Sequence, residues 1–144
     1  MAWSEFRDRV AEGAGCDIVE LGDHFVDCAG PPAPWFESWT TLAAMAAETT
    51  SIRLATCATR FPLREPGVLA HEAVTIDHIS GGRLELGSGN GVSVDPSPEM
   101  SGTPNWSAGE RVDRFGECIE IVAMLLSQDV STFRGGYSAI DGAV

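Results

Sequence analysis

Three short groups of residues in this sequence combine types that exchange protons with types that let a ligand approach the backbone. They are Asp23 and His24; Cys57, Ala58 and Thr59; and the segment from Gly87 to Gly91, which includes Asn90. A histidine imidazole exchanges a proton near neutral pH, and a neighbouring carboxylate can hold its orientation. The pair Asp23 and His24 therefore indicates acid–base chemistry. An aspartate that caps loop amides, beside a histidine packed at the rim, would give the same pattern.

The segment from Gly87 to Gly91 is rich in glycine, which permits positive φ angles and close approach of the backbone. It is not a dinucleotide-binding fingerprint, because it lacks the helix after its second glycine and the acidic residue on a following strand. A simple turn at the end of a strand is the second explanation of these glycines. Cys57 also has a second explanation, as a small buried thiol.

Each of these groups follows a short apolar run. The runs 17–22, 52–56 and 84–88 begin about 35 and about 32 residues apart, which is the length of one βα unit. This spacing predicts parallel strands joined by helical crossovers. The carboxyl ends of such strands meet at one edge of the sheet, so we expect the three groups to lie together there.

Apolar residues at helical spacing predict four helices, over 4–14, 37–49, 66–79 and 110–127. Pro66 suits the first turn of the third helix, because its missing amide hydrogen has no helical partner there. The fourth helix has the widest apolar stripe. We expect this stripe to pack in the core through Val112, Phe115, Ile119, Val122, Leu125 and Leu126.

The remaining segments are predicted as connections. A loop of about twenty residues, 89–109, is crowded with Gly, Pro, Ser and Asn, and a loop of this length is usually functional or mobile. Residues 130–140 are predicted as a small hairpin turned by a Gly-Gly pair. Between the third helix and the third strand, we expect Asp77 and Arg83 to bond locally and, with His78, to serve stability.

Composition limits the partners that this chain can have. A chain of 144 residues with 44% hydrophobic residues can bury a core, and we predict a single domain over 1–144. The formal net charge is -12, with nine Arg and no Lys. Such a surface repels phosphate backbones and anionic lipid, so nucleic acid and membrane surfaces are poor partners.

The cysteines and the N-terminus indicate a reducing compartment. Cys16, Cys28, Cys57 and Cys118 show neither CxxC spacing nor a matching histidine cluster, so we expect reduced thiols, no metal site and no disulfide framework. The first residues carry charges where a signal peptide needs an apolar run, and no uncharged apolar stretch approaches ~18 residues. The sequence therefore predicts a cytoplasmic protein.

Four segments together resemble the bacterial luciferase-like family of flavin- and deazaflavin-dependent oxidoreductases. They are Leu21–Phe25 (LGDHF), Trp39–Ala44 (WTTLAA), Asp77–Gly87 (DHISGGRLELG) and Gly109–Phe115 (GERVDRF). The likeness covers nearly the whole chain in order, and the third segment is specific. The family folds as a (β/α)₈ barrel, which typically needs ~250 residues. The resemblance implies an α/β chain that is a partial TIM barrel, containing strands two to four with their helices.

The resemblance also implies a cofactor and residues that contact it. Asp23 and His24 would lie beside the ring of coenzyme F420 or FMN, where His24 would stabilise or protonate the reacting species. The segment Cys57–Thr59 matches a bulge that carries a non-prolyl cis peptide bond against the ring in relatives that bind F420. The small side chains of this bulge favour F420 over FMN.

Residues after the third strand complete the implied cofactor site. Asn90 and Gly91 match positions that contact the ring or the ribityl chain of the cofactor. Val92 stands where some F420-dependent dehydrogenases of the family carry a carboxylate, which counts against that particular dehydrogenase chemistry. Four aromatic residues in or beside the long loops could either wall a substrate pocket or pack the loops. They are Trp35, Phe36, Trp39 and Trp106.

Two functions are compatible with these features. In the first, the chain belongs to an oxidoreductase or monooxygenase that uses reduced flavin or deazaflavin on a small organic substrate. In the second, it is a truncated, non-catalytic half-barrel whose exposed strand edges associate with a second copy, as a homo-oligomer, or with another half-barrel.

Overall fold

The computed structural model describes residues 3–5, 15–26, 33–92 and 95–144. Trp3 to Glu5 are helical, and the rest of the helix predicted over 4–14 lies outside the described residues, as does Cys28. All other predicted strands and helices fall within the described ranges or on their borders.

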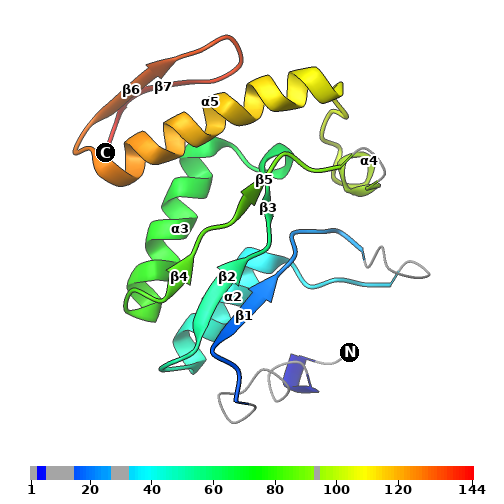
Figure 1. Cartoon of the computed structure of the whole chain (residues 1–144), viewed down its shortest axis with the longest axis vertical. Helices are drawn as coiled ribbons and strands as arrows, with labels where there is room; N and C mark the ends of the chain where they lie inside the picture. The colour runs from blue at the N-terminus through cyan, green and yellow to red at the C-terminus, as the bar shows by residue number, and fades with distance from the viewer. Residues whose placement is uncertain (1–2, 6–14, 27–32, 93–94) are drawn as a thin grey trace.

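Three parallel strands form the central sheet in the order β1-β2-β4 (Figure 1). They are β1 (Ile18–Leu21), β2 (Arg53–Thr56) and β4 (Leu84–Glu85). Val19 lies opposite Leu54, and Leu54 lies opposite Leu84, so the apolar runs align across the sheet. The predicted α/β class with parallel strands is therefore confirmed.

The third predicted strand, 84–88, is divided in the structure. Beyond β4 the chain leaves β2 and forms β5 (Ser88–Gly89), which pairs in parallel with β3 (Thr59–Arg60). Where the chain crosses from the side of β2 to the side of β3, Oγ1 of Thr56 accepts the N–H of Gly87 at 3.1 Å and donates to the Gly87 carbonyl at 2.7 Å. A β-carbon at Gly87 would overlap the Thr56 carbonyl oxygen, so the crossing requires glycine.

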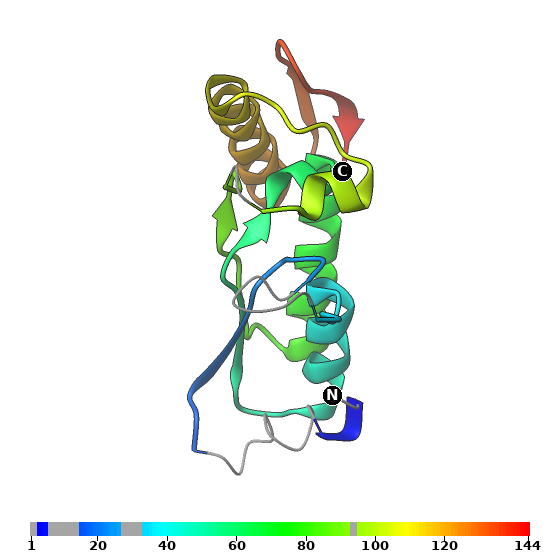
Figure 2. The same ribbon diagram turned by 90° about the vertical axis from the view of Figure 1, so that its right-hand side faces the viewer.

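Two helices cover one face of the sheet, as Figure 2 shows: α2 (Ser38–Glu48) and α3 (Pro66–Ser80). The Glu37 carboxylate caps α2, because it accepts the N–H groups of Trp39 at 3.0 Å and Thr40 at 2.7 Å. α3 ends where Gly81 adopts a left-handed φ of 72°. The helices and the sheet share one core, whose fully enclosed residues include Leu42, Leu54 and Leu69.

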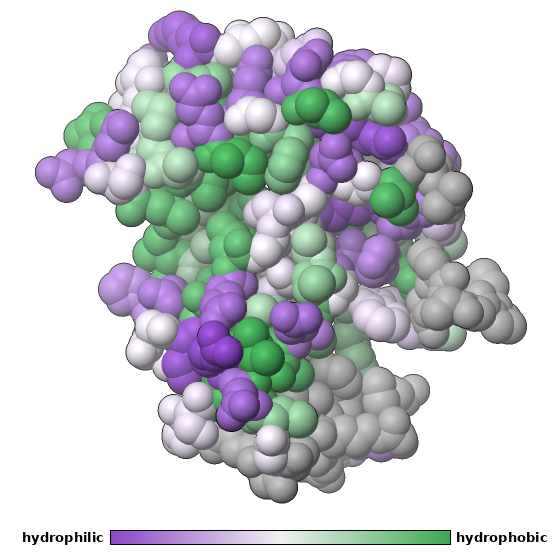
Figure 3. All heavy atoms as spheres, viewed as in Figure 1, coloured by the Kyte–Doolittle hydropathy of each residue, from purple (hydrophilic) through white to green (hydrophobic). Residues whose placement is uncertain are grey.

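The long helix α5 (Ala108–Ser127) lies across the end of α3, and only part of its predicted stripe is buried. Val122 is buried, together with Cys118 and Ile121. Among the described residues, α5 is covered mainly on the sides that face α3 and the C-terminal hairpin. Figure 3 shows apolar side chains on the indented surface between α3 and α5. Three residues predicted as core are exposed instead: Val112, Ile119 and Leu126.

The hairpin predicted over 130–140 is confirmed as an antiparallel pair of β6 (Ser131–Arg134) and β7 (Ala139–Ala143). Glu117 of α5 anchors its tip. The Glu117 carboxylate accepts three successive backbone N–H groups, from Gly136 at 2.6 Å, Tyr137 at 3.0 Å and Ser138 at 2.8 Å. Within the described ranges, no helix combines the length and the apolar character needed to cross a membrane.

Arg83 closes the turn between α3 and β4, where local bonding was expected. Its guanidinium donates to the carbonyl oxygens of Ala46 at 3.0 Å, Thr49 at 2.9 Å and Ile52 at 2.6 Å. The Asp77 carboxylate accepts the N–H that begins β4, at 3.3 Å. Arg83 thus satisfies carbonyls left open at the end of α2 and ties that helix to β2.

Replacing Arg83 with alanine should lower the free energy of unfolding by about 3 kcal/mol, because backbone carbonyls lose a charged donor. Arg83→Lys should restore little of this, since the single nitrogen of lysine cannot occupy the positions of both Nη1 and Nη2, from which Arg83 reaches the three carbonyls. Urea titration followed by circular dichroism measures both effects. Arg134→Ala, whose side chain is 73% exposed, is the matched control and should change stability by less than about 0.5 kcal/mol. Full rescue by lysine would contradict this account.

Candidate functional site

β1 and β2 end side by side in the central sheet, and β5 pairs with β3 beyond the end of β2 (Figure 1). This arrangement brings the predicted groups close to one another. A β-carbon placed on Gly22 would lie 3.0 Å from Cδ2 of His24 and 3.8 Å from the carbonyl oxygen of Cys57. A β-carbon on Gly89 would lie 3.5 Å from that of Ala58. Residues that are far apart in the sequence therefore share one small surface.

Asp23 is buried beneath this surface, with 4% of the residue exposed. Its carboxylate accepts the Ser38 hydroxyl of α2 at 2.9 Å and the Arg60 N–H of β3 at 3.1 Å, and it forms an ion pair with Arg64. These contacts match the second explanation of this residue, an aspartate that binds backbone amides. Asp23 thus joins the exit of β1 to two other elements.

Arg64 stands among three carboxylates. It forms ion pairs with Asp23 and Glu37, and its Nε lies 3.1 Å from Oε2 of Glu72. Burial by itself would raise the pKa of Glu37, but hydrogen bonds from the first turn of α2 and the Arg64 charge hold that pKa below its ordinary value. At Glu72, burial outweighs the attraction of Arg64 and raises the pKa above its ordinary value.

The side chain of His24 is 41% exposed, and its Nδ1 lies 2.8 Å from Oδ2 of Asp95. Burial by itself would raise the pKa of Asp95, but hydrogen bonds from Ser97 and His24 and the charge of Arg60 hold it below its ordinary value. The sequence indicated Asp23 as the carboxylate that holds His24. In the structure, His24 is bound instead to the carboxylate of Asp95.

Asp95 lies just before α4 (Ser97–Ser101), a short helix inside the segment predicted as one long loop. Arg60, which is 4% exposed, forms an ion pair with Asp95 and donates from Nη2 to the Val92 carbonyl at 3.3 Å. A β-carbon on Gly91, whose φ is +73°, would lie 2.6 Å from Nε of Arg60. Glycine is needed at position 91 because the Arg60 side chain fills that space.

The segment from Cys57 to Thr59 divides between the surface and the core. The peptide bond between Cys57 and Ala58 is cis, as the resemblance implied. Cys57 and Ala58 are exposed, so the alternative of a buried Cys57 thiol is wrong. Thr59 is fully buried, and its hydroxyl accepts the indole N–H of Trp39 at 3.1 Å. The Thr59 side chain therefore faces the core.

A hollow of about 550 Å³ opens beside His24. Its walls include the aromatic rings of Phe25 and Trp35 and the hydroxyl-bearing residues Ser101 and Thr103. The Trp35 ring meets the His24 ring edge-on, with centroids 6.4 Å apart. The hollow thus combines apolar walls with groups that form hydrogen bonds.

The aromatic residues near the loops divide between the two predicted roles. Trp35 lines the hollow beside His24. Trp39 is buried in the core, and Trp106 packs against that core. Phe36 meets Trp3 edge-on, with centroids 6.0 Å apart. Pocket formation and loop packing therefore both occur.

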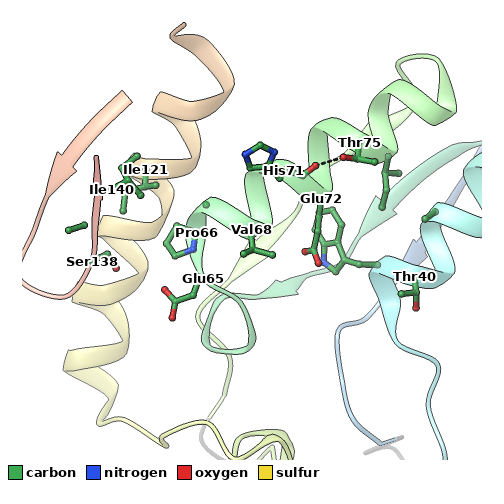
Figure 4. Close-up of a pocket in the computed structure, with 15 residues that line it drawn as sticks. Thr40, Glu65, Pro66, Val68, His71, Glu72, Thr75, Ile121, Ser138 and Ile140 are labelled. Atoms are coloured by element: carbon green, nitrogen blue, oxygen red, sulfur yellow. Dashed lines mark hydrogen bonds between the residues drawn. The ribbon is translucent and has the colours of Figure 1, made fainter. Parts of the chain in front are cut away.

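A second hollow, of about 810 Å³, lies among α2, α3, α5 and the C-terminal hairpin (Figure 4). Its lining is mostly apolar and includes Pro66, Val68, Ile121 and Ile140. It lies on the helical side of the molecule, and no residue of the strand exits lines it. We assign the candidate site to the edge of the sheet, because the polar groups converge there.

Within the described ranges, no group of three or more His, Cys, Asp or Glu residues is placed to hold a metal ion. Cys16, Cys57 and Cys118 are free thiols. Burial raises the pKa of Cys118 to about 12, so this thiol stays protonated near neutral pH. Of these three thiols, Cys57 is the one at the candidate site.

The sequence model of the family described as luciferase-like monooxygenase matches residues 7–144. The chain belongs to this family. The F420-dependent glucose-6-phosphate dehydrogenase of Beutenbergia cavernae is 36% identical to it over 140 residues, which are 94% of this chain and 40% of that relative. The pyrimidine monooxygenase RutA of Agrobacterium fabrum is 34% identical over 110 residues, covering 73% and 29% of the two chains.

Solved structures agree with this membership. An F420-dependent secondary alcohol dehydrogenase, in complex with an F420-acetone adduct, matches 92% of this chain and 40% of its own with a TM-score of 0.78 and 26% identity. The luciferase-like chain thus spans 40% or less of the length of these three relatives.

Sequence reasoning missed five charged residues of this candidate site: Arg60, Arg64, Asp95, Glu37 and Glu72. The two arginines lie in a segment predicted as a loop, where arginine is common at the surface. Asp95 carries one local signal, an Asp-Pro-Ser turn in which its Oδ1 accepts the Ser97 N–H at 2.8 Å. That signal predicts a turn but names no partner.

Replacing Arg64 with methionine leaves the buried Asp23 carboxylate without its cation, so the free energy of unfolding at pH 7 should fall by about 3 kcal/mol. The remaining carboxylates repel one another, which raises their pKa values in the folded variant above those in the unfolded chain. A carboxyl group whose pKa is raised in the folded state binds its proton more readily there than in the unfolded chain. The free energy of unfolding of the variant therefore rises as the pH falls through the raised pKa. The difference between the variant and the native chain should therefore narrow from pH 7 to pH 5.

Urea titrations at the two pH values measure this difference. Arg53→Met is the control, because the side chains of Arg53 and its partner Glu85 are 55% and 48% exposed. A difference for Arg64→Met that is the same at both pH values would show that uncompensated carboxylates are not its cause.

Proposed function

We propose that this luciferase-like chain holds coenzyme F420 or FMN at the carboxyl edge of its sheet and serves an oxidation or reduction of a small organic substrate. The observation that carries the proposal is the meeting of His24, the Cys57 carbonyl and Ala58 at that edge. It is supported by 36% identity to an F420-dependent dehydrogenase over most of this chain.

The finer fold in this proposal is a partial (β/α)₈ barrel. β1, β2 and β4 would be strands two to four, with α2 and α3 on the outer face. The parallel order and the TM-score of 0.78 to an F420-dependent dehydrogenase support this assignment. Reacting groups of such barrels lie at the carboxyl ends of the strands, which is where His24 and Cys57 lie.

The exposed edge fits a flat cofactor ring. Gly89 carries no side chain and Ala58 carries only a methyl group, so the backbone here can be approached closely. The His24 ring stands at the rim of this surface. We propose that Cys57 and Ala58 contact the ring through their backbone.

Not every residue predicted as a cofactor contact enters this proposal. Asn90 follows β5 and is half-buried, and its amide can both donate and accept hydrogen bonds to a cofactor. Thr59 and Gly91 are left out, because Thr59 is enclosed in the core and Gly91 packs on Arg60. Asp23 is proposed as the buried anchor of the site instead of a reacting group.

His24 supplies the acid–base group of the proposed reaction. When bound, F420 or FMN supplies hydride transfer at its ring. The proton that leaves or joins the substrate in the same reaction needs a separate acceptor or donor. Because Nδ1 of His24 is bound to Asp95, its Nε2 is the nitrogen available for this proton. Val92 offers no carboxylate for that role.

The relatives favour coenzyme F420 over FMN, since two of the three compared above are F420-dependent by name. The hollow of about 550 Å³ beside His24 suits a small substrate with an apolar part and a hydroxyl or carbonyl group. Phe25 and Trp35 would contact the apolar part, and Ser101 or Thr103 the polar part.

Association without catalysis is the second candidate function. β1 and β4 are the outer strands of the described sheet, and their outer edges have no neighbour among the described strands. Self-association through these edges would follow. We favour the catalytic function, because the three relatives compared above are two dehydrogenases and a monooxygenase by name.

Adding F420 or, separately, FMN to the purified chain should perturb the visible absorption band of the cofactor as it binds. Gly89→Leu places a side chain over the Ala58 surface, and its β-carbon makes an ordinary contact, since a β-carbon at Gly89 meets only Ala58, at 3.5 Å. This variant should weaken cofactor binding at least about tenfold, or ~1.4 kcal/mol.

Gly109→Leu is the matched control, since nothing lies within 4 Å of a β-carbon at Gly109. This variant should bind the cofactor as the native chain does. The proposal fails if neither cofactor responds to the native chain, or if Gly89→Leu and Gly109→Leu bind with equal affinity.

A further inference from the structure

We infer that Asp95 is the positioning residue of His24: it orients the imidazole so that Nε2 faces the proposed cofactor surface, and the buried Arg60 holds Asp95 in place. The inference rests on the proposed function for its purpose, but the geometry that it describes does not depend on a bound cofactor.

The Asp95 carboxylate determines which ring nitrogen carries the proton. An ionised carboxylate only accepts hydrogen bonds, so Nδ1 of His24, 2.8 Å from Oδ2 of Asp95, must donate. In the neutral ring, a proton on Nδ1 leaves Nε2 with a free lone pair. Nε2 is therefore prepared to accept a proton, which it can later return.

The same contact directs Nε2 toward the edge of the sheet. A β-carbon on Gly22 would lie 3.4 Å from Nε2 of His24 and 3.8 Å from the Cys57 carbonyl oxygen, so the nitrogen and that carbonyl both lie beside Gly22, at the exit of β1. The His24 side chain is 41% exposed, so Nε2 belongs to a ring that solvent and ligands can reach.

Asp95 is itself held on both oxygens. Its Oδ1 accepts the Ser97 N–H at 2.8 Å, and its Oδ2 forms the ion pair with Arg60. The side chains of Arg60 and Asp95 are 4% and 3% exposed, so rotation of the carboxylate would leave a buried cation without its counterion. This cost keeps the acceptor in one orientation.

The ring nitrogens of His24 can be observed directly by ¹⁵N nuclear magnetic resonance of the native chain without cofactor, at about pH 8, where an ordinary imidazole is neutral. His24→Gln assigns the resonances by their loss. His71 and His78, both exposed, serve as internal references. We expect Nδ1 of His24 to be protonated and Nε2 to be unprotonated. A proton on Nε2 in the native chain would overturn the inference.

Asp95→Ala removes the acceptor, and its His24 ring should shift toward the tautomer with the proton on Nε2. Asp129→Ala makes the same chemical change at an exposed aspartate and should leave the His24 resonances unchanged. Unchanged resonances in Asp95→Ala would also overturn the inference. Asp95→Ala also removes the carboxylate partner of Arg60, so it changes more than the hydrogen bond to His24. The measurement on the native chain tests the inference without that second change.

Activity separates this inference from the proposed function. In the cofactor-loaded protein, Asp95→Ala should lower kcat about tenfold or more while the Kd of the cofactor changes less than about twofold, because Asp95 lies behind His24. Cofactor binding by the native chain together with an unshifted His24 tautomer in Asp95→Ala would leave the proposed function standing and remove the role of Asp95.

Discussion

The buried carboxylate of Asp23 is the interaction on which the arrangement of the site depends. It binds the hydroxyl that begins α2, the backbone of β3 and the guanidinium of Arg64, so it fixes the exit of β1 against two other elements. A buried carboxylate costs several kcal/mol unless a cation and hydrogen bonds compensate it. Its partners come from separate segments, so the charge is compensated only when these segments have all reached their places.

Two arginines divide the negative charge of this region between them. Arg64 compensates Asp23, Glu37 and Glu72, whereas Arg60 compensates Asp95. Arg60 connects the two groups, since its backbone N–H binds Asp23 and its guanidinium binds Asp95. The anchor below the surface and the exposed imidazole therefore share one support. A strongly acidic chain can bury the carboxylates of Asp23 and Asp95 because each lies within reach of an arginine.

Local signals predicted most of the secondary structure, and they failed where a contact between elements decided the outcome. Pro66 is a local signal for the start of a helix and Gly81 for its end, and in the structure α3 begins at Pro66 and is capped by Gly81. The strand expected over 84–88 is instead divided, because Thr56 of another strand takes the hydrogen bonds of Gly87. Part of the α5 stripe is exposed, because an apolar spacing shows that a face can be buried but not what covers it.

The sequence by itself determined the α/β order, the likeness to luciferase-like proteins and the position of His24 and Cys57 at strand exits, because periodicity, caps and motifs depend on residues close together in the chain. Only the tertiary structure decided which carboxylate serves the histidine. Asp23 is adjacent to His24 in sequence, yet the bound partner is Asp95, 71 positions away. A hydrogen bond depends on distance and direction in space. For His24 and Asp95, these are set by the ion pair that holds Asp95, in the segment before α4, against Arg60.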